Sequence, residues 1–218
     1  MTLEPDYWTP EPLWKGQTAH VVASGPSATD EVIHSLRGLN VIVVNSTVLL
    51  AQWAPVWFFM DRDVLFQDRR LTPRISRDGV DMAAFAFGFE GIVVTTAPRV
   101  KCAVPCVRLV SAPRMKEFPL PGSVTIRHGR SSGHTAISLA VAMGANNVIL
   151  HGYDMRLVDG LEHQHHEYED RPRDIAIYER DFIPGFAGWN EQAKRAGVSI
   201  TNATPGSALK EFPMKDGA

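Results

Sequence analysis

Ser131–Asp154 reads SSGHTAISLAVAMGANNVILHGYD, and this stretch decides the fold. A turn of small residues opens an apolar segment with helical spacing, Gly144 stands where such a helix would stop, and a second apolar run ends in Gly-Tyr-Asp. The first turn of a helix offers free N–H groups to an anion, and a parallel strand delivers the residues that follow it to one edge of the sheet. The stretch therefore predicts the phosphate-binding, and by extension nucleotide-binding, face of an α/β sheet.

Further apolar runs predict the rest of this sheet. Their Val, Ile and Phe residues follow one another without polar alternation, which is typical of parallel strands buried on both faces. The predicted strands are residues 20–24, 41–44, 56–60, 92–96, 106–110, 147–151 and 198–202. Helices are predicted from about Thr29, over 135–143 and over 174–196, the last divided at Pro184-Gly185. We expect an α/β fold with a single doubly wound, mostly parallel sheet of the Rossmann type.

Composition limits the other possibilities. With 218 residues, 44% of them hydrophobic, the chain can bury one sizeable core, and we expect residues 1–218 to form a single nucleotide-binding α/β domain. The two cysteines complete neither a zinc site nor a disulfide framework. No run approaches the ~18 apolar residues of a membrane span, and the N-terminus lacks a signal-peptide pattern. These features predict a soluble, cytoplasmic protein.

The middle of the chain differs in charge and regularity. Residues 62–130 contain 12 basic and 6 acidic residues and are cut by prolines, although the net charge of the whole chain is −2. We expect this part to be a less regular basic insertion that covers the site as a lid. Its positive charge favours an anionic partner, DNA included, held over the site, and a solvated basic surface is the equal alternative.

The turn after the first predicted strand is a candidate phosphate-binding loop. It reads Ser24-Gly25-Pro26-Ser27, in which glycine permits close backbone approach and the start of the next helix attracts an anion. It lacks the complete Gly-x-Gly-x-x-Gly pattern and a Walker lysine, so an ordinary strand-to-helix turn is the alternative. Asn45 follows the second strand, where it would either hydrogen-bond a base or ribose or cap a turn.

Three histidines follow the Gly-Tyr-Asp motif. His163, His165 and His166 lie among carboxylates, and imidazoles titrate near neutrality, as a general base requires. Two other hypotheses stay open for them: a metal site with an oxygen ligand from Asp154, and a solvated His-rich loop.

Asp61 and Asp63 follow the third predicted strand. Paired carboxylates of this kind hold Mg²⁺ or Mn²⁺ against a diphosphate, since hard cations prefer oxygen ligands. The alternative is a polar strand end in which one carboxylate caps the next helix.

The order of these motifs resembles a known family. The motifs are VASGPS (22–27), VVN (43–45), SSG (131–133) with Ala136 and Gly144, ILHGYD (149–154), the histidine group and NATPGSAL (202–209). In this order they resemble the bacterial lipooligosaccharide sialyltransferases. They also resemble the broader set that includes motility-associated glycosyltransferases and archaeal-type pterin diphosphokinases, whereas residues 62–130 do not align.

The resemblance implies a nucleotide-binding domain with a lid that uses a CMP-linked sugar and requires no metal or other cofactor. It implies a general base at His165 or His166, with His163 as a further candidate. In the family, tyrosines near the strand-end motif bind the leaving phosphate, whereas here residues 155–159 read MRLVD, so Tyr153, Tyr168 or Arg156 would take that role. The implied nucleotide-binding residues are Ser24, Gly25, Pro26, Ser27, Asn45, Ser132, Gly133, Gly152, Tyr153 and Asp154.

The predicted reaction is therefore the transfer of a sugar from a CMP-type nucleotide donor to a hydroxyl acceptor. One alternative is a Mg- or Mn-dependent diphosphokinase of the pterin type, in which Asp61, Asp63 and Asp154 would hold the metal. Another is a non-catalytic nucleotide-binding protein of the kind that phages encode. The sequence specifies neither the sugar, the acceptor nor the oligomeric state.

Overall fold

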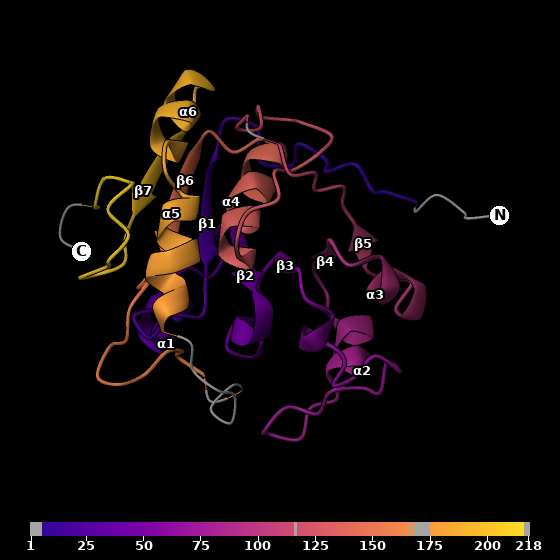
Figure 1. The fold of residues 1–218 in the computed structure, drawn as a ribbon. Helices are drawn as coiled ribbons and strands as arrows, with labels where there is room; N and C mark the ends of the chain where they lie inside the picture. The colour runs from indigo at the N-terminus through magenta and orange to yellow at the C-terminus, as the bar shows by residue number, and fades with distance from the viewer. Residues whose placement is uncertain (1–5, 116, 166, 168–174, 216–218) are drawn as a thin grey trace.

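The computed structural model describes residues 6–115, 117–165, 167 and 175–215. Seven strands in this part of the chain form one sheet, and every pair of neighbours in it is parallel. The strand order is β5-β4-β3-β2-β1-β6-β7 (Figure 1). The strands are β1 (Thr18–Val22), β2 (Val41–Val44), β3 (Val56–Phe59), β4 (Ile92–Thr95), β5 (Arg108–Leu109), β6 (Asn147–His151) and β7 (Ser199–Asn202). The predicted α/β class and single parallel sheet are confirmed.

Helices cover both faces of this sheet, as a doubly wound fold requires. They are α1 (Asp30–Ser35), α2 (Met82–Gly88), α3 (Pro98–Ala103), α4 (Ser132–Ala142), α5 (Ile183–Gly185) and α6 (Trp189–Arg195). Short turns of 3₁₀ helix, η1 (Asn45–Leu49) and η2 (Arg62–Val64), and a π-helical turn, η3 (Tyr178–Phe182), complete the set. Among the described helices, none has the length and apolar character needed to span a membrane.

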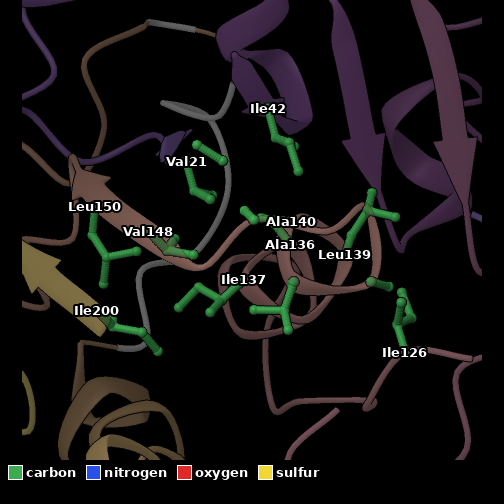
Figure 2. Packing of buried hydrophobic residues seen from close by; sticks show 14 of the residues in the cluster. Val21, Ile42, Ile126, Ala136, Ile137, Leu139, Ala140, Val148, Leu150 and Ile200 are labelled. Carbon is green, nitrogen blue, oxygen red and sulfur yellow. The ribbon is translucent and has the colours of Figure 1, made fainter. Parts of the chain in front are cut away.

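Two hydrophobic cores lie on opposite faces of the sheet. Alternate residues of β1, β2, β3 and β4 enter different cores, so that Val56 and Phe58 of β3 join one core while Trp57 and Phe59 join the other. The first core packs against α4 and α6, and the second against α1, α2 and α3. Every residue of α4 is buried, and Figure 2 shows its Ala136, Ile137 and Ala140 side chains close to the strands. This helix is therefore held in place from all sides.

The helix boundaries predicted at specific residues are present in the structure. Thr29 caps α1, because its side chain accepts a hydrogen bond from the Val32 N–H. Gly144 follows α4 at a φ of 96°, a conformation that favours glycine. The predicted division near Pro184 is also present: α5 ends at Gly185 and α6 begins after Gly188.

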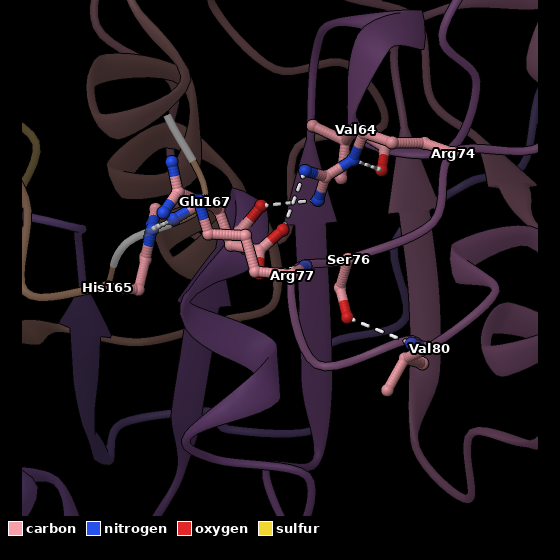
Figure 3. A network of polar contacts seen from close by, with 8 residues as sticks. Val64, Arg74, Ser76, Arg77, Val80, His165 and Glu167 are labelled. Carbon is pink, nitrogen blue, oxygen red and sulfur yellow. Dashed lines mark hydrogen bonds and ion pairs between the residues drawn. The ribbon is translucent and has the colours of Figure 1, made fainter. Parts of the chain in front are cut away.

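Residues 62–130 contain both of the strands predicted within them. They supply β4 and β5, together with α2 and α3 on one face. Apart from η2, the other described residues of this part lie in turns and loops, of which the loop around Arg74 lies near His165 and Glu167 (Figure 3). Cys102 and Cys106, also in this part, are free thiols at the surface.

Candidate functional site

A cavity of about 420 Å³ opens at the carboxyl end of the sheet. It lies where β1 has β2 on one side and β6 on the other, the switch point at which doubly wound folds bind ligands. Its walls come from the segments that follow β1, β2, β3 and β6, from the first turn of α4, and from residues 162–163 and 177–182. The predicted site residues that line it are Ser24, Gly25, Asn45, Asp61, Asp63, Ser132, Gly133, Gly152, Tyr153, Asp154, Arg156 and His163.

The loops after β1 and β6 are in direct backbone contact. The N–H of Gly25 donates to the carbonyl of Gly152 over 3.0 Å. A Cβ at Gly25 would lie 2.1 Å from Asp154 Oδ2 and 2.4 Å from Gly152 O, so no larger residue fits without displacing the strand-end loop. Gly152 has a φ of +69°, and a Cβ there would lie 2.7 Å from Ala23 O. Both glycines are thus required for the approach of these loops.

Asp154 presents a buried carboxylate to the cavity. Only 2% of the residue is exposed, and its Oδ2 accepts hydrogen bonds from the N–H and the hydroxyl of Ser27 at 3.3 and 2.9 Å. Its Oδ1 is buried and has no hydrogen-bond partner among the described residues. Burial raises the pKa of Asp154, although the hydrogen bonds from Ser27 act in the opposite direction. The free oxygen is suited to accept a hydrogen bond from a ligand hydroxyl or amine.

Asn45 adds a second unpartnered oxygen to the same cavity. Its Oδ1 is buried without a hydrogen-bond partner in the described part of the chain. The residue begins η1 in a left-handed conformation with a φ of 54°, which asparagine tolerates better than most residues. Its side chain thus leaves the end of β2 at the cavity wall.

Tyr153 joins the end of β6 to the start of α4. Its hydroxyl donates to the carbonyl of Gly133 over 2.9 Å, and its backbone N–H donates to the hydroxyl of Thr204. A Cβ at Gly133 would lie 3.1 Å from the tyrosine ring. Burial raises the pKa of Tyr153. Since its hydroxyl hydrogen is already donated, Tyr153 holds the two elements together.

The N-terminus of α4 opens into the cavity. Ser131 caps the helix by accepting a hydrogen bond from the N–H of His134 over 3.4 Å, and Ser131, Ser132 and Gly133 all line the cavity. The unpaired N–H groups of a first helical turn, together with the helix dipole, favour an anion there.

His134 is a structural residue of α4. It is fully buried, and its ring stacks on that of Phe186 with centroids 3.4 Å apart. Burial, with the nearby charges of Arg127 and Arg130, lowers the pKa of His134 to about 3, so its ring is neutral at physiological pH.

The segment that contains His163 and His165, here called the histidine segment, places one histidine at the cavity and the other behind it. His163 lines the cavity, and its Nε2 lies 3.9 Å from Glu162 Oε1. The ring of His165 stacks on that of His163 at a centroid distance of 5.4 Å, but His165 is buried and does not line the cavity. His166 and Tyr168 lie outside the described residues. Pro26 and Ser27 also lie outside the cavity lining, although Ser27 acts on it through Asp154.

A buried ion pair anchors this segment to the loop around Arg74. Arg74 Nη1 lies 2.8 Å from Glu167 Oε2, and the N–H of Arg77 donates to Glu167 Oε1 (Figure 3). The same guanidinium donates to Ser46 in η1 and to the carbonyl of Val64. The backbone N–H of Glu167 in turn donates to His165 Nδ1 over 3.4 Å. Sequence reasoning missed this pair, because nothing in two segments 93 residues apart indicates that they meet.

The chain resembles a known protein in its fold, although its sequence matches none. No protein-family model matches it, and no curated protein matches its sequence. Its fold is similar to that of the sialyltransferase CstII from Campylobacter jejuni, solved in complex with a substrate analogue, cytidine-5'-monophosphate. The TM-score is 0.53 at 13% sequence identity, over 92% of this chain and 85% of that chain.

This likeness shows that the chain has a sialyltransferase-like fold. The sequence resemblance to the sialyltransferases is thereby supported at the level of the fold. The pterin diphosphokinase and phage hypotheses receive no such support.

The predicted three-carboxylate metal site is not formed. Asp61 and Asp63 do line the cavity, but Asp63 pairs with the neighbouring guanidinium of Arg62 at 2.6 Å. Within the described residues, no three His, Cys, Asp or Glu side chains gather as metal ligands would. Asp61, Asp63 and Asp154 therefore do not form the metal site that the diphosphokinase alternative requires.

Several lining residues escaped sequence reasoning. They are Arg130, Glu162, Ile177, Tyr178 and Phe182. Tyr178 donates to Glu162 Oε1 over 3.2 Å, and burial raises its pKa. The predicted helix over 174–196 held the only available signal, because Tyr178 and Phe182 are four residues apart and share a helical face.

Proposed function

We propose that this protein is a glycosyltransferase-like enzyme that transfers a sugar from a CMP-type nucleotide donor to a hydroxyl acceptor. The observation that carries the proposal is the pair of buried, unpartnered oxygens, Asn45 Oδ1 and Asp154 Oδ1, in the wall of one cavity. A buried acceptor without a donor costs about 1–3 kcal/mol, and a bound ligand with hydroxyl and amine donors removes that cost. The fold shared with a sialyltransferase solved with cytidine-5'-monophosphate supports the choice of nucleotide.

The cavity provides separate regions for the parts of such a donor. Asp154 and Asn45 face the ribose and base, which carry hydroxyl and amine hydrogens. The first turn of α4 receives the phosphate, whose negative charge its N–H groups stabilise. Arg156 lines the cavity with its guanidinium fixed by the carbonyls of Gly206 and Leu157, at 2.8 and 3.1 Å, and adds positive charge.

The chemistry is a displacement at the anomeric carbon. The acceptor oxygen forms a bond to this carbon as the bond from carbon to the phosphate oxygen breaks, and CMP leaves with the electron pair. The acceptor proton passes to His163, the histidine that lines the cavity, and the carboxylate of Glu162 stabilises the imidazolium that forms. The assignment moves the general base from His165 or His166 to His163, because a base must reach the reacting hydroxyl.

Donor binding is tested by thermal unfolding with CMP, UMP, AMP and ATP, each in EDTA and in Mg²⁺. We expect CMP to raise the Tm most, and to do so equally in both buffers, since a ligand that binds only the native state stabilises it. Stabilisation by ATP alone, and only with Mg²⁺, would contradict the proposal in favour of the diphosphokinase. A chain that responds to none of these nucleotides would exclude both.

The base is tested by CMP release from CMP-N-acetylneuraminate. We expect His163→Ala to lower the rate by about 10²–10⁴-fold while the Tm shift with CMP is retained. His34→Ala is the matched control, because His34 is exposed on α1. Full activity of His163→Ala with loss in His165→Ala would reassign the base to the buried ring.

A further inference from the structure

A second cavity, of about 370 Å³, adjoins the first. It lies between the loop that leads from β5 to α4 and the junction of α5 with α6, where Gly185 and Trp189 form part of its wall. Arg114, Arg127, His128 and Arg130 also line it, and none of its lining residues is acidic. The structure records no ion pair between these arginines and any other described residue.

Arg127 is held in a fixed position in this wall. Its guanidinium lies 4.7 Å from the centroid of the Trp189 ring, and its Nη1 donates to Gln192 Oε1 over 3.0 Å. Burial lowers the pKa of Arg127, against the influence of Glu117. A partly desolvated cation with neutral contacts is stabilised by an anion placed beside it.

Arg130 connects the two cavities. It lines both, and it directly precedes Ser131, the N-cap of α4. A Cβ at Gly185 would lie 2.8 Å from Arg130 Cγ, so the stem of the arginine passes close to the chain at this glycine. The side chain of Arg130 therefore lies between a molecule bound in the second cavity and the first cavity.

We propose that the second cavity is the acceptor subsite and that it binds the anionic group, a carboxylate or a phosphate, of a hydroxyl-bearing acceptor. The identification of the ligand as an acceptor rests on the proposed function, whereas the anion site itself rests on the arginines alone. Planar guanidinium groups bind both kinds of anion through paired hydrogen bonds. With the anion held by Arg114 and Arg127, the rest of the acceptor extends past Arg130 toward the donor phosphate and His163.

The test uses three hexoses of similar size: glucose, glucuronate and glucose 6-phosphate. Each is titrated into the ¹⁵N-labelled full chain, with and without saturating CMP, and the backbone and arginine Nε–H signals are followed. We expect both anionic hexoses to bind at least tenfold more tightly than glucose, and more weakly as salt is raised. The tighter of the two identifies the carboxylate or the phosphate as the natural group.

Arg114→Gln and Arg127→Gln should each weaken the anionic hexoses on the order of tenfold while CMP binding is unchanged. Arg114 is exposed, so its replacement leaves the fold intact, and Arg99→Gln on α3 is the matched control with the same change of charge. If the anionic hexoses bind no better than glucose, or if both variants behave as Arg99→Gln does, the inference is wrong. If they bind as expected but CMP does not, the anion site stands and the proposed function fails.

Discussion

Gly25 lets the loops after β1 and β6 touch because it has no side chain. The N–H of Gly25 contacts Gly152, and the position of its absent Cβ is occupied by the Asp154 carboxylate. The two unpartnered oxygens of the site belong to residues that follow different strands, so the distance between those strand ends sets what can bind. At this scale, the contact between the loops after β1 and β6 leaves no room for a Cβ at Gly25.

Gly25→Ala is expected to displace the Asp154 loop. The added methyl group meets backbone as well as side chain, so we expect a loss of about 1–3 kcal/mol in the free energy of unfolding. The Tm shift with CMP should also be lost. Both are measured by urea denaturation and thermal unfolding.

Gly88→Ala is the control for this change. Gly88 ends α2, and a Cβ there would meet no atom within 4 Å, so this variant should be as stable as the original or slightly more so. Equal behaviour of the two alanine variants would show that Gly25 is not constrained as described.

At the scale of elements, the histidine segment is attached at two points. Glu167 pairs with Arg74, and the N–H of Gln164 donates to the carbonyl of Ser24 over 2.9 Å. The side chains of Arg74 and Glu167 are only 10% and 5% exposed, so the pair is shielded from solvent. His163 lies just before both attachments, and its place at the cavity depends on them.

Arg74→Gln should release this segment without unfolding the sheet. Removing one partner leaves the Glu167 carboxylate buried and uncompensated, at a cost on the order of 3 kcal/mol. We expect hydrogen exchange at the Gln164 amide to accelerate at least tenfold, with exchange in β1 and β6 unchanged. CMP release should slow more than CMP affinity falls, because the pair positions His163.

Lys194→Gln provides the comparison for a lost ion pair. Lys194 pairs with Glu191 on the exposed side of α6, where water and salt screen such pairs and leave them little effect on stability. This variant should leave the exchange of Gln164 unaltered. Unchanged exchange in Arg74→Gln as well would refute the anchoring role of the buried pair.

At the scale of the whole molecule, neutral histidines sit inside the fold. His20 of β1 and His151 of β6 lie side by side, with Nδ1 and Nε2 3.0 Å apart and the rings stacked. Burial lowers the pKa of His151 to about 4, and lowers that of His20 as well, with Lys215 contributing to both. With His134 on the opposite face of the sheet, the native state holds three imidazoles that resist protonation.

These groups predict that stability falls as the pH is lowered. Above pH 6.5 these histidines are neutral in both the native and the unfolded state, so the free energy of unfolding is at its full value. Below pH 6.5 the unfolded chain binds protons that the native state does not bind, and the free energy of unfolding falls. For His151 the loss approaches about 1.4 kcal/mol for each pH unit between 6.5 and its folded pKa of about 4. Asp154 acts with the opposite sign, because a raised carboxyl pKa favours proton binding by the native state.

Urea denaturation at pH 7 and pH 5 measures this dependence. His151→Gln keeps hydrogen-bonding capacity beside His20 but cannot titrate, so its difference between the two pH values should be smaller. His34→Gln, at an exposed position of α1, should retain the full difference. An identical pH dependence in His151→Gln would contradict the assignment to the buried pair.

Much of the fold could be predicted from local sequence. Val41–Val44 and Asn147–His151 are apolar runs that form β2 and β6 with the predicted bounds, because strands buried on both faces leave an unmistakable pattern. The convergence of the loops after β1, β2 and β6 was also predictable, since parallel strands end at one edge. In residues 62–130 the strands predicted over 92–96 and 106–110 are also present as β4 (Ile92–Thr95) and β5 (Arg108–Leu109), although β5 keeps only two of its five predicted residues.

The sequence by itself determined the sheet, its turns and the small residues at the switch point, because the residue patterns of strands and helices lie within short stretches of the chain. Only the tertiary structure decided that His163 lines the cavity while His165 lies behind it. It alone paired Arg74 with Glu167 and His20 with His151, and placed Arg130 between two cavities. The physical reason is that the burial, the ion pairs and the pKa values of these side chains depend on contacts between residues far apart in the sequence. Those contacts form only when the sheet has folded.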